Sequence, residues 1–371
     1  MRRSLPAQIP IRWPPNVVSG HDWPMAQVTL SDVARTAGVS LATASRVLNG
    51  SSRVPGKAIS QRVMQAAEKL GYVPNASAQA LARSSSGLLG VVIQDLEDPY
   101  FSAVAAGFQE AAGGQGQLVL MAQTSRDADL TIVALGGLNA QRVDGVLMVG
   151  SLDLSAEQRA VFGDQLARVE ARGGQVVTVG QSYGIGRTVY PADREGGRAI
   201  GQAAIAGGYR RFALLDDVTR APSAVDRAAG FAAAIEESGG RIEYDVPAPV
   251  TAAGGRVAGD ALVRHLEEHP GGPMCFFAMT DAVAVAAMGR ALHAGIRVPD
   301  ELGVVGFDGI AAGRDIAPSL TTFDLPLRDI GRRAFELVHH PEDADLPETW
   351  EVREDTITIP GRLWQGGSTM H

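Results

Sequence analysis

Residues 28–49 read VTLSDVARTAGVSLATASRVLN, a stretch whose residue spacing predicts two short helices joined by a tight turn. Apolar residues recur at helical spacing in each half of the stretch. These residues are Leu30, Val33 and Ala34 in the first half, and Val39, Ala44, Val47 and Leu48 in the second. Thr29 and Asp32 have the spacing of a capping box at the start of the first helix. Gly38 can adopt the left-handed conformation that ends this helix, and Ser40 can cap the next one.

The second predicted helix carries side chains that suit a DNA groove. Paired helices with this turn form a helix-turn-helix, whose second helix lies in the major groove. Leu41 and Ala42 come first and cannot hydrogen-bond a base, so we expect apolar contacts there, for example with a thymine methyl group. Arg46 is the candidate for a bidentate contact with guanine. An ordinary helical hairpin with common capping residues is the alternative interpretation.

Other polar side chains around these helices suit the phosphate backbone, where contacts set register rather than specificity. The predicted phosphate-contacting residues are Thr29, Ser40, Thr43, Ser45, Asn49, Arg53 and Tyr72. Arg53 lies in a loop that precedes a third predicted helix over about 57–70.

The stretch resembles the headpiece of the lac repressor and galactose repressor family of bacterial transcriptional regulators. In that family the pattern T-x-x-D-V-A-x-x-A-G-V-S-x-x-T-x-S-R-x-L-N recurs, and it matches this chain from Thr29 to Asn49. The resemblance continues through the third helix into Gly-Tyr-Val-Pro-Asn at 71–75 and over nearly all of the remaining chain. The loop at 53–57 departs from the family, since it lacks the usual serine cap and is one residue longer. The resemblance implies a helix-turn-helix DNA-binding headpiece over 26–74.

The resemblance also implies that residues 75–87 form a hinge helix and linker, which folds when two subunits meet over DNA. Leu81 matches a leucine that is wedged into the central minor-groove step and kinks the duplex. A linker whose Leu81 only covers nearby apolar surface is the alternative. Further DNA-contacting positions implied by the match are Leu30, Asn75, Ala78, Leu81 and Ala82.

The charge is distributed unevenly along the 371 residues, a length that suggests two or three domains. The net charge is −8, yet residues 26–86 hold seven Arg or Lys against Asp32 and Glu68, which makes that segment +5. Residues 1–25 carry +2, which leaves −15 for residues 87–371. This asymmetry is expected of a basic DNA-reading domain attached to an acidic body.

Cysteine content and targeting signals indicate the compartment. Cys275 is the single cysteine, which excludes an intrachain disulfide framework and fits a reducing cytoplasm. No apolar run is long enough to span a membrane. Prolines interrupt residues 1–25, so no signal-peptide core forms there, and we expect a disordered tail or a misassigned start with Met25 as the initiator. The predicted localisation is cytoplasmic and nucleoid-associated.

From residue 88 onward, short apolar strands alternate with longer helices, which predicts an α/β fold with doubly wound parallel sheets. Strands are expected at 88–93, 117–122, 145–150, 175–180, 212–217, 275–280 and 302–308. Helices are expected at 100–115, 128–140, 157–172, 195–207, 225–238, 256–268 and 282–294.

The resemblance implies that these two series are the lobes of a periplasmic-binding-protein-like body over 88–371, which binds the effector and forms the dimer. Lobe one is predicted at about 88–187 plus 325–343. Lobe two is predicted at about 188–322 plus 344–363.

Ligands of open parallel sheets bind beyond the carboxyl ends of the strands, so the residues just after each strand are the candidates. Several of them match positions that contact the effector in the family. The predicted effector-binding residues are Gln94, Asp95, Asp98, Tyr100, Phe101, Ser151, Gln181, Asp193, Arg227, Val250, Thr280 and Asp308.

Arg227 and Asp308 are the strongest candidates for effector contact, because a guanidinium offers a fork of donors and a carboxylate offers only acceptors. Together they can bracket the vicinal hydroxyls of a sugar. The alternative is that Arg227 forms a structural ion pair across the cleft with Asp308 or Asp193. Asp281 is expected to cap the helix that begins at 282.

Three departures from the family bear on the ligand. Val250 stands where many relatives have an aromatic residue, so a stacking platform for a sugar ring is missing. Gln181 replaces a frequent aspartate, and Ala221 stands where a purine-responsive relative would have arginine. A sugar or polyol effector is therefore predicted, rather than a nucleobase.

These features predict a homodimer that reads a near-palindromic operator and represses carbohydrate-metabolism genes until an effector releases it. A regulator that needs a corepressor or that activates, with a non-sugar effector, is the main alternative, and a free sugar-binding receptor is a remote one. No enzyme is expected, since the chain has no G-x-S-x-G elbow, no P-loop and no histidine spacing typical of a metal site. No cofactor or metal is predicted. The last residues lack a heptad repeat, so no tetramerising coiled coil is expected.

Overall fold

A computed structural model describes residues 28–48, 55–73, 85–218, 221–339 and 346–370. The chain divides into two compact units, Met1–Ser84 and Ser85–His371, and each is described by itself. The predicted tail over 1–25 lies outside the described residues, as do the predicted DNA contacts of Asn49, Arg53, Asn75, Ala78, Leu81 and Ala82.

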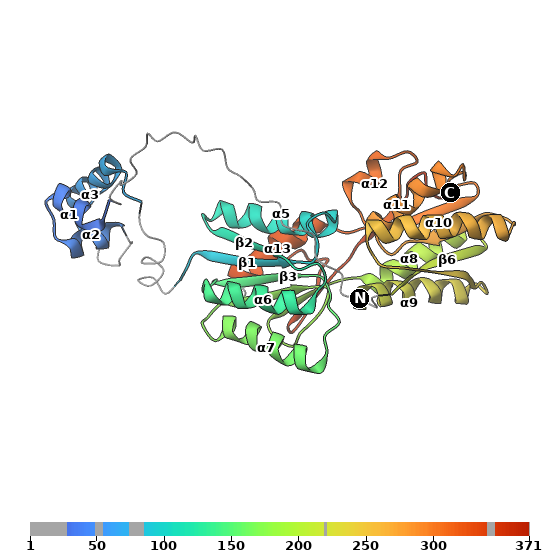
Figure 1. The fold of residues 1–371 in the computed structure, drawn as a ribbon, viewed down its shortest axis with the longest axis horizontal. Coiled ribbons are helices and arrows are strands. Elements are labelled where there is room, and N and C mark those ends of the chain that lie inside the picture. Colours follow the sequence, from blue (N-terminus) through green and yellow to red (C-terminus); the bar gives the residue numbers. More distant parts are fainter. Residues whose placement is uncertain (1–27, 49–54, 74–84, 219–220, 340–345, 371) are drawn as a thin grey trace, which may run out of the picture. The chain divides into compact units, whose positions relative to one another are not determined.

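The first unit contains a headpiece of three helices (Figure 1). They are α1 (Leu30–Ala37), α2 (Leu41–Leu48) and α3 (Lys57–Leu70). The small core of this headpiece consists of Val33, Ala34, Ala37, Ala44, Val63, Ala66 and Ala67. The small size of most of these side chains lets the three helices approach closely.

The predicted helix ends of the headpiece are confirmed. Thr29 caps α1 and forms a reciprocal capping box with Asp32. Gly38 is left-handed with φ of 63°, a conformation that a residue with a Cβ atom adopts at a cost. The Ser40 hydroxyl accepts a hydrogen bond of 3.2 Å from the backbone N–H of Thr43, which caps α2.

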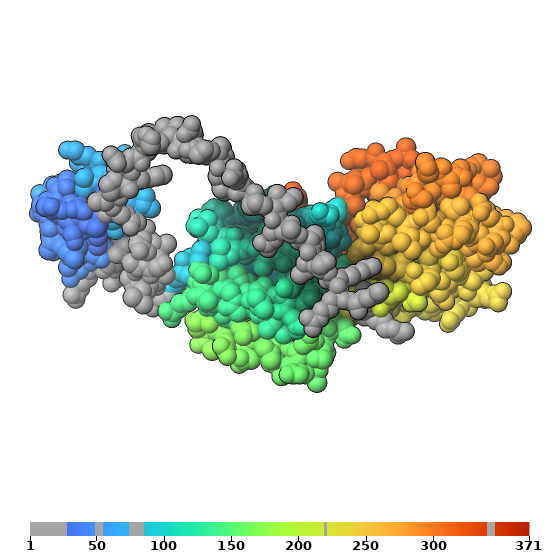
Figure 2. Space-filling view, in the orientation of Figure 1, coloured from blue at the N-terminus to red at the C-terminus, as the bar shows by residue number. Residues whose placement is uncertain are grey.

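The second unit is a body of two lobes, each built around one sheet with helices on both faces (Figure 1). The strand order is β11-β12-β5-β4-β3-β1-β2 in lobe one and β13-β10-β9-β8-β6-β7 in lobe two. Most neighbouring strands are parallel, and the antiparallel pairs are β10 with β13 and β11 with β12. Figure 2 shows the two lobes of the body as a green mass and a yellow-to-orange mass.

Lobe one contains seven strands and four helices among the described residues. Its strands are β1 (Leu88–Ile93), β2 (Leu118–Gln123), β3 (Gly145–Val149), β4 (Gln175–Val179), β5 (Arg187–Pro191), β11 (Glu351–Arg353) and β12 (Thr356–Ile359). Its helices are α5 (Pro99–Gly114), α6 (Ala128–Ala140), α7 (Ala156–Glu170) and α13 (Leu327–His339). Helices α5 and α13 pack together on one face of the sheet, and α6 and α7 pack together on the other.

Lobe two contains six strands and five helices among the residues described. Its strands are β6 (Arg211–Asp217), β7 (Ile242–Ala248), β8 (Met274–Phe277), β9 (Leu302–Asp308), β10 (Thr321–Asp324) and β13 (Arg362–Trp364). Its helices are α8 (Asp193–Ala206), α9 (Pro222–Glu237), α10 (Ala252–Glu268), α11 (Asp281–His293) and α12 (Ala311–Asp315). Helices α8 and α9 pack together, as do α10 and α11.

The predicted lobe boundaries were wrong at two places. Residues 187–191 and 351–359 form β5, β11 and β12, and these strands belong to the sheet of lobe one. The prediction put most of β5 and all of β11 and β12 in lobe two. Pairing of β12 with β5, with Ile357 opposite Val189, decides their place. The chain therefore crosses between the lobes three times, after β5, after β10 and after β12.

Candidate functional site

The outward face of α2 carries the predicted base-reading side chains. Leu41 is 51% exposed, and Ala42 and Arg46 are exposed as well. A large apolar side chain held in water costs free energy unless a partner covers it, so the exposure of Leu41 is compatible with a contact surface.

The residues predicted to contact phosphates differ in how exposed and how free their side chains are. Ser40 is exposed, and its hydroxyl lies 2.8 Å from that of Thr43, which is partly buried together with Ser45. Tyr72, another predicted phosphate contact, and Leu30, predicted more generally to contact DNA, pack against the headpiece core. The exposed Thr29 hydroxyl is engaged by the Asp32 carboxylate at 2.7 Å. A DNA contact by Thr29 would therefore share this hydroxyl with the capping box.

A cleft lies in the body where the carboxyl ends of strands from both sheets meet. It encloses about 580 Å³ of empty space, which includes space open to solvent. Ten of the twelve predicted effector-binding residues line it: Gln94, Asp98, Tyr100, Phe101, Ser151, Asp193, Arg227, Val250, Thr280 and Asp308.

The other two predicted residues do not line the cleft. The Asp95 carboxylate accepts a hydrogen bond of 2.9 Å from the backbone N–H of Glu97 and so shapes its own loop. The Gln181 side-chain oxygen accepts from the backbone N–H of Leu152 at 2.8 Å and from the Tyr183 hydroxyl at 3.1 Å. Both side chains are held by other hydrogen bonds, Asp95 within its own turn and Gln181 by the loop after β3 and by Tyr183, so a position after a strand did not bring them into the cleft.

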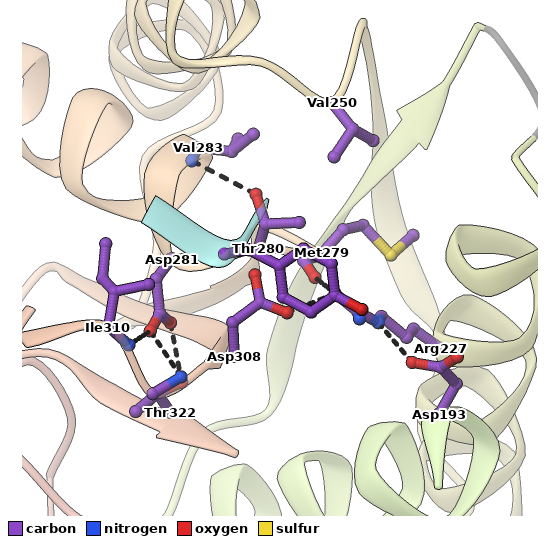
Figure 3. Close-up of polar contacts among 12 residues, drawn as sticks. Asp193, Arg227, Val250, Met279, Thr280, Asp281, Val283, Asp308, Ile310 and Thr322 are labelled. Atoms are coloured by element: carbon purple, nitrogen blue, oxygen red, sulfur yellow. Dashed lines mark hydrogen bonds and ion pairs between the residues drawn. The ribbon is translucent and has the colours of Figure 1, made fainter. Parts of the chain in front are cut away.

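Arg227 forms the centre of a buried charge cluster in lobe two (Figure 3). Its Nε donates to Asp193 Oδ1 at 2.7 Å, and its Nη1 donates to the Met279 carbonyl at 2.7 Å. Nη1 also lies 3.1 Å from Asp308 Oδ1. The guanidinium carbon stands 3.8 Å from the centroid of the Phe307 ring. The predicted ion pairs exist, but all three charged residues belong to lobe two, so the pairs do not cross the cleft.

The crossing of α8 and α9 holds Arg227 next to Asp193. Gly197 on α8 faces the Arg227 carbonyl, and a Cβ atom at Gly197 would overlap that oxygen. Gly230 on α9 faces the Arg194 carbonyl in the same way. Glycines at both positions let the two helices pack backbone to backbone. This contact brings the first residue of α8 within reach of the arginine.

Burial makes the cleft carboxylates hard to ionise. Loss of water is the largest effect on the pKa of Asp308, Asp193 and Asp98, and it raises all three above the ordinary range, although the nearby arginines act in the opposite direction. Asp308 also has φ of 114° and Met279 has φ of 68°, which non-glycine residues rarely adopt. Strained backbone of this kind concentrates at functional sites.

The predicted capping role of Asp281 was wrong. The Thr280 hydroxyl caps α11 by accepting from the Val283 N–H, whereas the Asp281 carboxylate turns toward the loop after β9 (Figure 3). Asp281 accepts from the N–H groups of Gly309 and Ile310 at 2.8 Å each, and from the Thr322 hydroxyl at 2.6 Å. These bonds hold the loop that follows Asp308. Burial raises the pKa of Asp281 to about 7.

Two buried oxygens near the cleft have no hydrogen-bond donor among the described residues. One is Oε1 of Gln94 in lobe one, and the other is Oδ1 of Asp308 in lobe two, whose ion pair with Arg227 lacks hydrogen-bond geometry. Both side chains are at most 3% exposed. A buried acceptor without a donor costs free energy, so each oxygen gains stability from a ligand that donates a hydrogen.

Arg126 is a cleft residue that the sequence analysis missed. Its Nη2 donates to the Val250 carbonyl at 3.1 Å, a hydrogen bond from lobe one to lobe two. Its guanidinium carbon lies 5.7 Å from the Phe101 ring centroid. Arg126 follows the carboxyl end of β2, so the rule applied to the other strands could have found it. The cleft lining also includes residues after β6 and β8 that went unpredicted: Ser223, Ala224 and Met279.

Both units match known proteins. Residues 29–75 match the bacterial regulatory proteins of the lacI family, and residues 202–369 match the periplasmic binding protein-like domain. Over 341 residues the chain is 30% identical to the ribose operon repressor of Halalkalibacterium halodurans, which covers 91% of this chain and 98% of that repressor. The chain belongs to the lacI family.

Solved structures of this family share the fold. The lac repressor dimer bound to operator and the anti-inducer ONPF aligns with a TM-score of 0.76 and 25% identity, covering 93% of this chain and 99% of that one. A lacI-family regulator from Arthrobacter sp. FB24 in complex with lactose aligns with a TM-score of 0.61 and 25% identity, covering 76% and 98% of the two chains. The predicted α/β body with a helix-turn-helix headpiece is confirmed.

Membership in the lacI family makes the chain a DNA-binding transcriptional regulator and not an enzyme, as predicted. In the part of the chain that the structure describes, no helix combines the length and apolar character needed to cross a bilayer.

Proposed function

We propose that this lacI-family regulator represses carbohydrate-metabolism genes and is released from its operator by a sugar or polyol that binds in the cleft. The proposal rests above all on the two donorless oxygens, Gln94 Oε1 and Asp308 Oδ1. They come from different lobes, so a ligand with several hydroxyl groups can donate to both walls at once.

The remaining lining of the cleft supports a small, uncharged, hydroxyl-rich ligand. Tyr100 and Phe101 form an edge-to-face pair with centroids 5.0 Å apart, and Val250 adds a third apolar side chain. Ala221 also lines the cleft and offers no donor for a purine ring. Ribose in the relative's name and lactose in the Arthrobacter complex agree with this class.

On the DNA side, α2 makes the base contacts, and the flanking polar residues contact phosphates and so set the position of the headpiece along the duplex. Leu41 and Ala42 contact apolar base edges, and Arg46 contacts a guanine. Two headpieces read a near-palindromic operator, and hinge helices within the hinge-and-linker segment 75–87 occupy the minor groove between them. The regulator acts in the cytoplasm, in association with the nucleoid.

A homodimer is part of the proposal, and an apolar edge of lobe one supports it. Strand β2 is an edge strand, on which Leu118 is 69% and Met121 is 38% exposed. Exposed apolar edge strands favour pairing with another chain. We expect the mass of a dimer in light scattering, and a shift toward monomer for Leu118→Glu. The matched control is Val352→Glu on the opposite edge strand β11, where Val352 is 56% exposed.

The ligand class can be tested by thermal shift with a panel of sugars, polyols, nucleosides and amino acids. A ligand that binds only the folded chain raises the unfolding temperature. Each stabilising compound is then added to a complex with a DNA duplex selected by this protein from a random pool. Stabilisation by a sugar together with loss of DNA binding is expected. Stabilisation by no sugar would overturn the ligand class. Tighter DNA binding in the presence of a stabilising sugar would show that the sugar is a corepressor and does not release the regulator from DNA.

The cleft itself can be tested with Gln94→Met, which removes the donorless oxygen. This variant should lose the thermal shift given by the sugar. Gln202→Met is the matched control, because Gln202 is exposed on α8. Equal thermal shifts in both variants would exclude Gln94 from the binding site.

A further inference from the structure

Asp144 collects hydrogen bonds from the residues that follow the linker. The Ser85 hydroxyl and the Gly87 N–H each donate to Oδ2 at 2.7 Å. The N–H and hydroxyl of Ser86 donate to Oδ1 at 2.9 and 3.2 Å. One partly buried carboxylate thus accepts four hydrogen bonds from three consecutive residues.

These three residues are where the body begins. Ser85 is the first residue of the second unit, and β1 starts at Leu88. The Ser86 hydroxyl also accepts from the Leu88 N–H at 3.1 Å, and Gly87 is left-handed with φ of 69°. The Asp144 carboxylate therefore fixes Ser85–Gly87 against lobe one at the point where the chain enters β1.

Helix α6 joins this carboxylate to the cleft. Asp144 lies between the end of α6 and β3, whereas Arg126 and the capping residue Asp127 lie at the start of α6. A helix of 13 residues is about 20 Å long. Arg126, just before α6, thus makes the hydrogen bond to lobe two, and Asp144, in the turn between α6 and β3, anchors the linker.

The contacts of α6 make it a stiff connection. Asp127 accepts from the Leu130 N–H at 2.8 Å and closes the first turn. Near the other end, Leu138 fills the space above Gly90 of β1, where a Cβ atom would overlap it. The Asn139 amide donates to the backbone and side-chain oxygens of Gln165 on α7, at 2.9 Å each. These contacts hold both ends of α6 against its neighbours in lobe one.

We propose that Asp144 is a positioning residue for operator binding. Its carboxylate anchors the linker to lobe one, and a change in the position of Arg126 in the cleft is transmitted to Asp144 through α6. The inference rests on the proposed function, because it assumes that DNA binding depends on how the linker leaves the body. Such a route is established only by a measured energetic coupling between its two ends. Here the ends are single side chains, Arg126 and Asp144, so substitutions can measure that coupling.

Asp144→Asn is the sharpest variant. It preserves the side-chain volume, but it puts an NH2 group opposite a backbone N–H that had faced an oxygen, so it breaks at least one hydrogen bond, whichever oxygen is replaced. Asp153→Asn is the matched control, because Asp153 is exposed in the loop after β3 and the charge change is the same. Ser86→Ala is a milder second variant that removes only one of the donors.

The first measurement is the affinity of each full-length variant for a duplex selected from a random pool by the unsubstituted protein. We expect Asp144→Asn to weaken binding about fivefold, Ser86→Ala about twofold, and Asp153→Asn not at all. Amide exchange at Ser86 and Gly87 should rise in Asp144→Asn. Unchanged affinity in both Asp144→Asn and Ser86→Ala would overturn the anchor. Failure to select any duplex would instead contradict the proposed function.

The second measurement is a double-mutant cycle with Arg126→Met, which removes the hydrogen bond to the Val250 carbonyl. A purely structural role of Asp144 gives additive effects, because residues at opposite ends of a helix share no contact. The proposed route requires that Arg126→Met changes DNA affinity about threefold in the unsubstituted protein and has little effect in Asp144→Asn. Equal changes in both backgrounds, or no change in either, would overturn the route through α6.

Discussion

In the headpiece, Leu41, Ala42 and Arg46 stand exposed on one helix within six residues of sequence. In the body, Arg227 and Asp308 are at most 5% exposed and come from elements about eighty residues apart. An exposed side chain on a preformed helix can change without disturbing the fold. A buried charge cannot change without disturbing its partners. Binding and stability should therefore be separable in the headpiece and linked in the cleft.

The largest expected effect concerns Arg227. Replacement by methionine leaves Asp193 and Asp308 buried without a cation, which should lower the free energy of unfolding of the body by about 3–5 kcal/mol. Denaturant unfolding followed by circular dichroism measures this loss. The same replacement at the exposed Arg46 should change stability by less than about 0.5 kcal/mol. Similar losses of stability for Arg227→Met and Arg46→Met would contradict the expected difference between the cleft and the headpiece.

The next effect is a pH dependence of the body. Because burial raises the pKa of Asp281 to about 7, the folded protein binds a proton that the unfolded chain releases near pH 4. The free energy of unfolding should therefore fall as the pH rises from about 4 to about 7, by at most about 1.4 kcal/mol per pH unit for each such carboxyl. The raised pKa of Asp308 acts in the same direction. Unfolding midpoints in denaturant across this pH range measure the slope.

Asp281→Asn should reduce this slope. The Asn oxygen can still accept from Gly309 and Ile310, and the Thr322 hydroxyl can turn to accept from the new NH2 group. The exposed carboxylate of Asp245 gives the control, since Asp245→Asn should leave the slope as it is. An Asp281→Asn variant with the slope of the unsubstituted protein would assign the pH dependence to other groups.

A third effect belongs to the headpiece and to DNA alone. Arg46→Ala should weaken binding to the selected duplex by about 1–3 kcal/mol and relax the preference at one base pair in each half-site. Fluorescence anisotropy with a set of half-site variants measures both. If discrimination among all half-site variants survived unchanged, Arg46 would not be the guanine-reading residue.

The smallest effect tests the local origin of the headpiece helices. Thr29→Ala removes the cap of α1 and should cost about 1 kcal/mol of headpiece stability. Hydrogen exchange of the α1 amides in the full chain measures this cost. Thr29→Ser keeps the accepting hydroxyl and should exchange as the unsubstituted protein does. Exchange that rises equally in both variants would show that the threonine methyl group, and not the cap, stabilises α1.

The sequence alone predicted the elements whose signal lies within a few residues. The capping box of Thr29 and Asp32, the left-handed Gly38 and the apolar strands β1, β3 and β9 all appear where periodicity and turn chemistry put them. It missed short strands such as β5 and β12, with the sequences RTVYP and TITI. Such segments become strands through their neighbours, and their pairing partners lie far away in the sequence.

Sequence by itself therefore determined the helix-turn-helix, the alternating α/β body and most residues at the strand ends, because each follows from local spacing and the geometry of parallel sheets. Only the tertiary structure decided that Arg227 pairs within lobe two, that Asp281 holds the loop after β9 and that Asp144 holds Ser85–Gly87. A buried carboxylate binds whichever donors the packed chain brings within about 3 Å, and no local pattern encodes that distance.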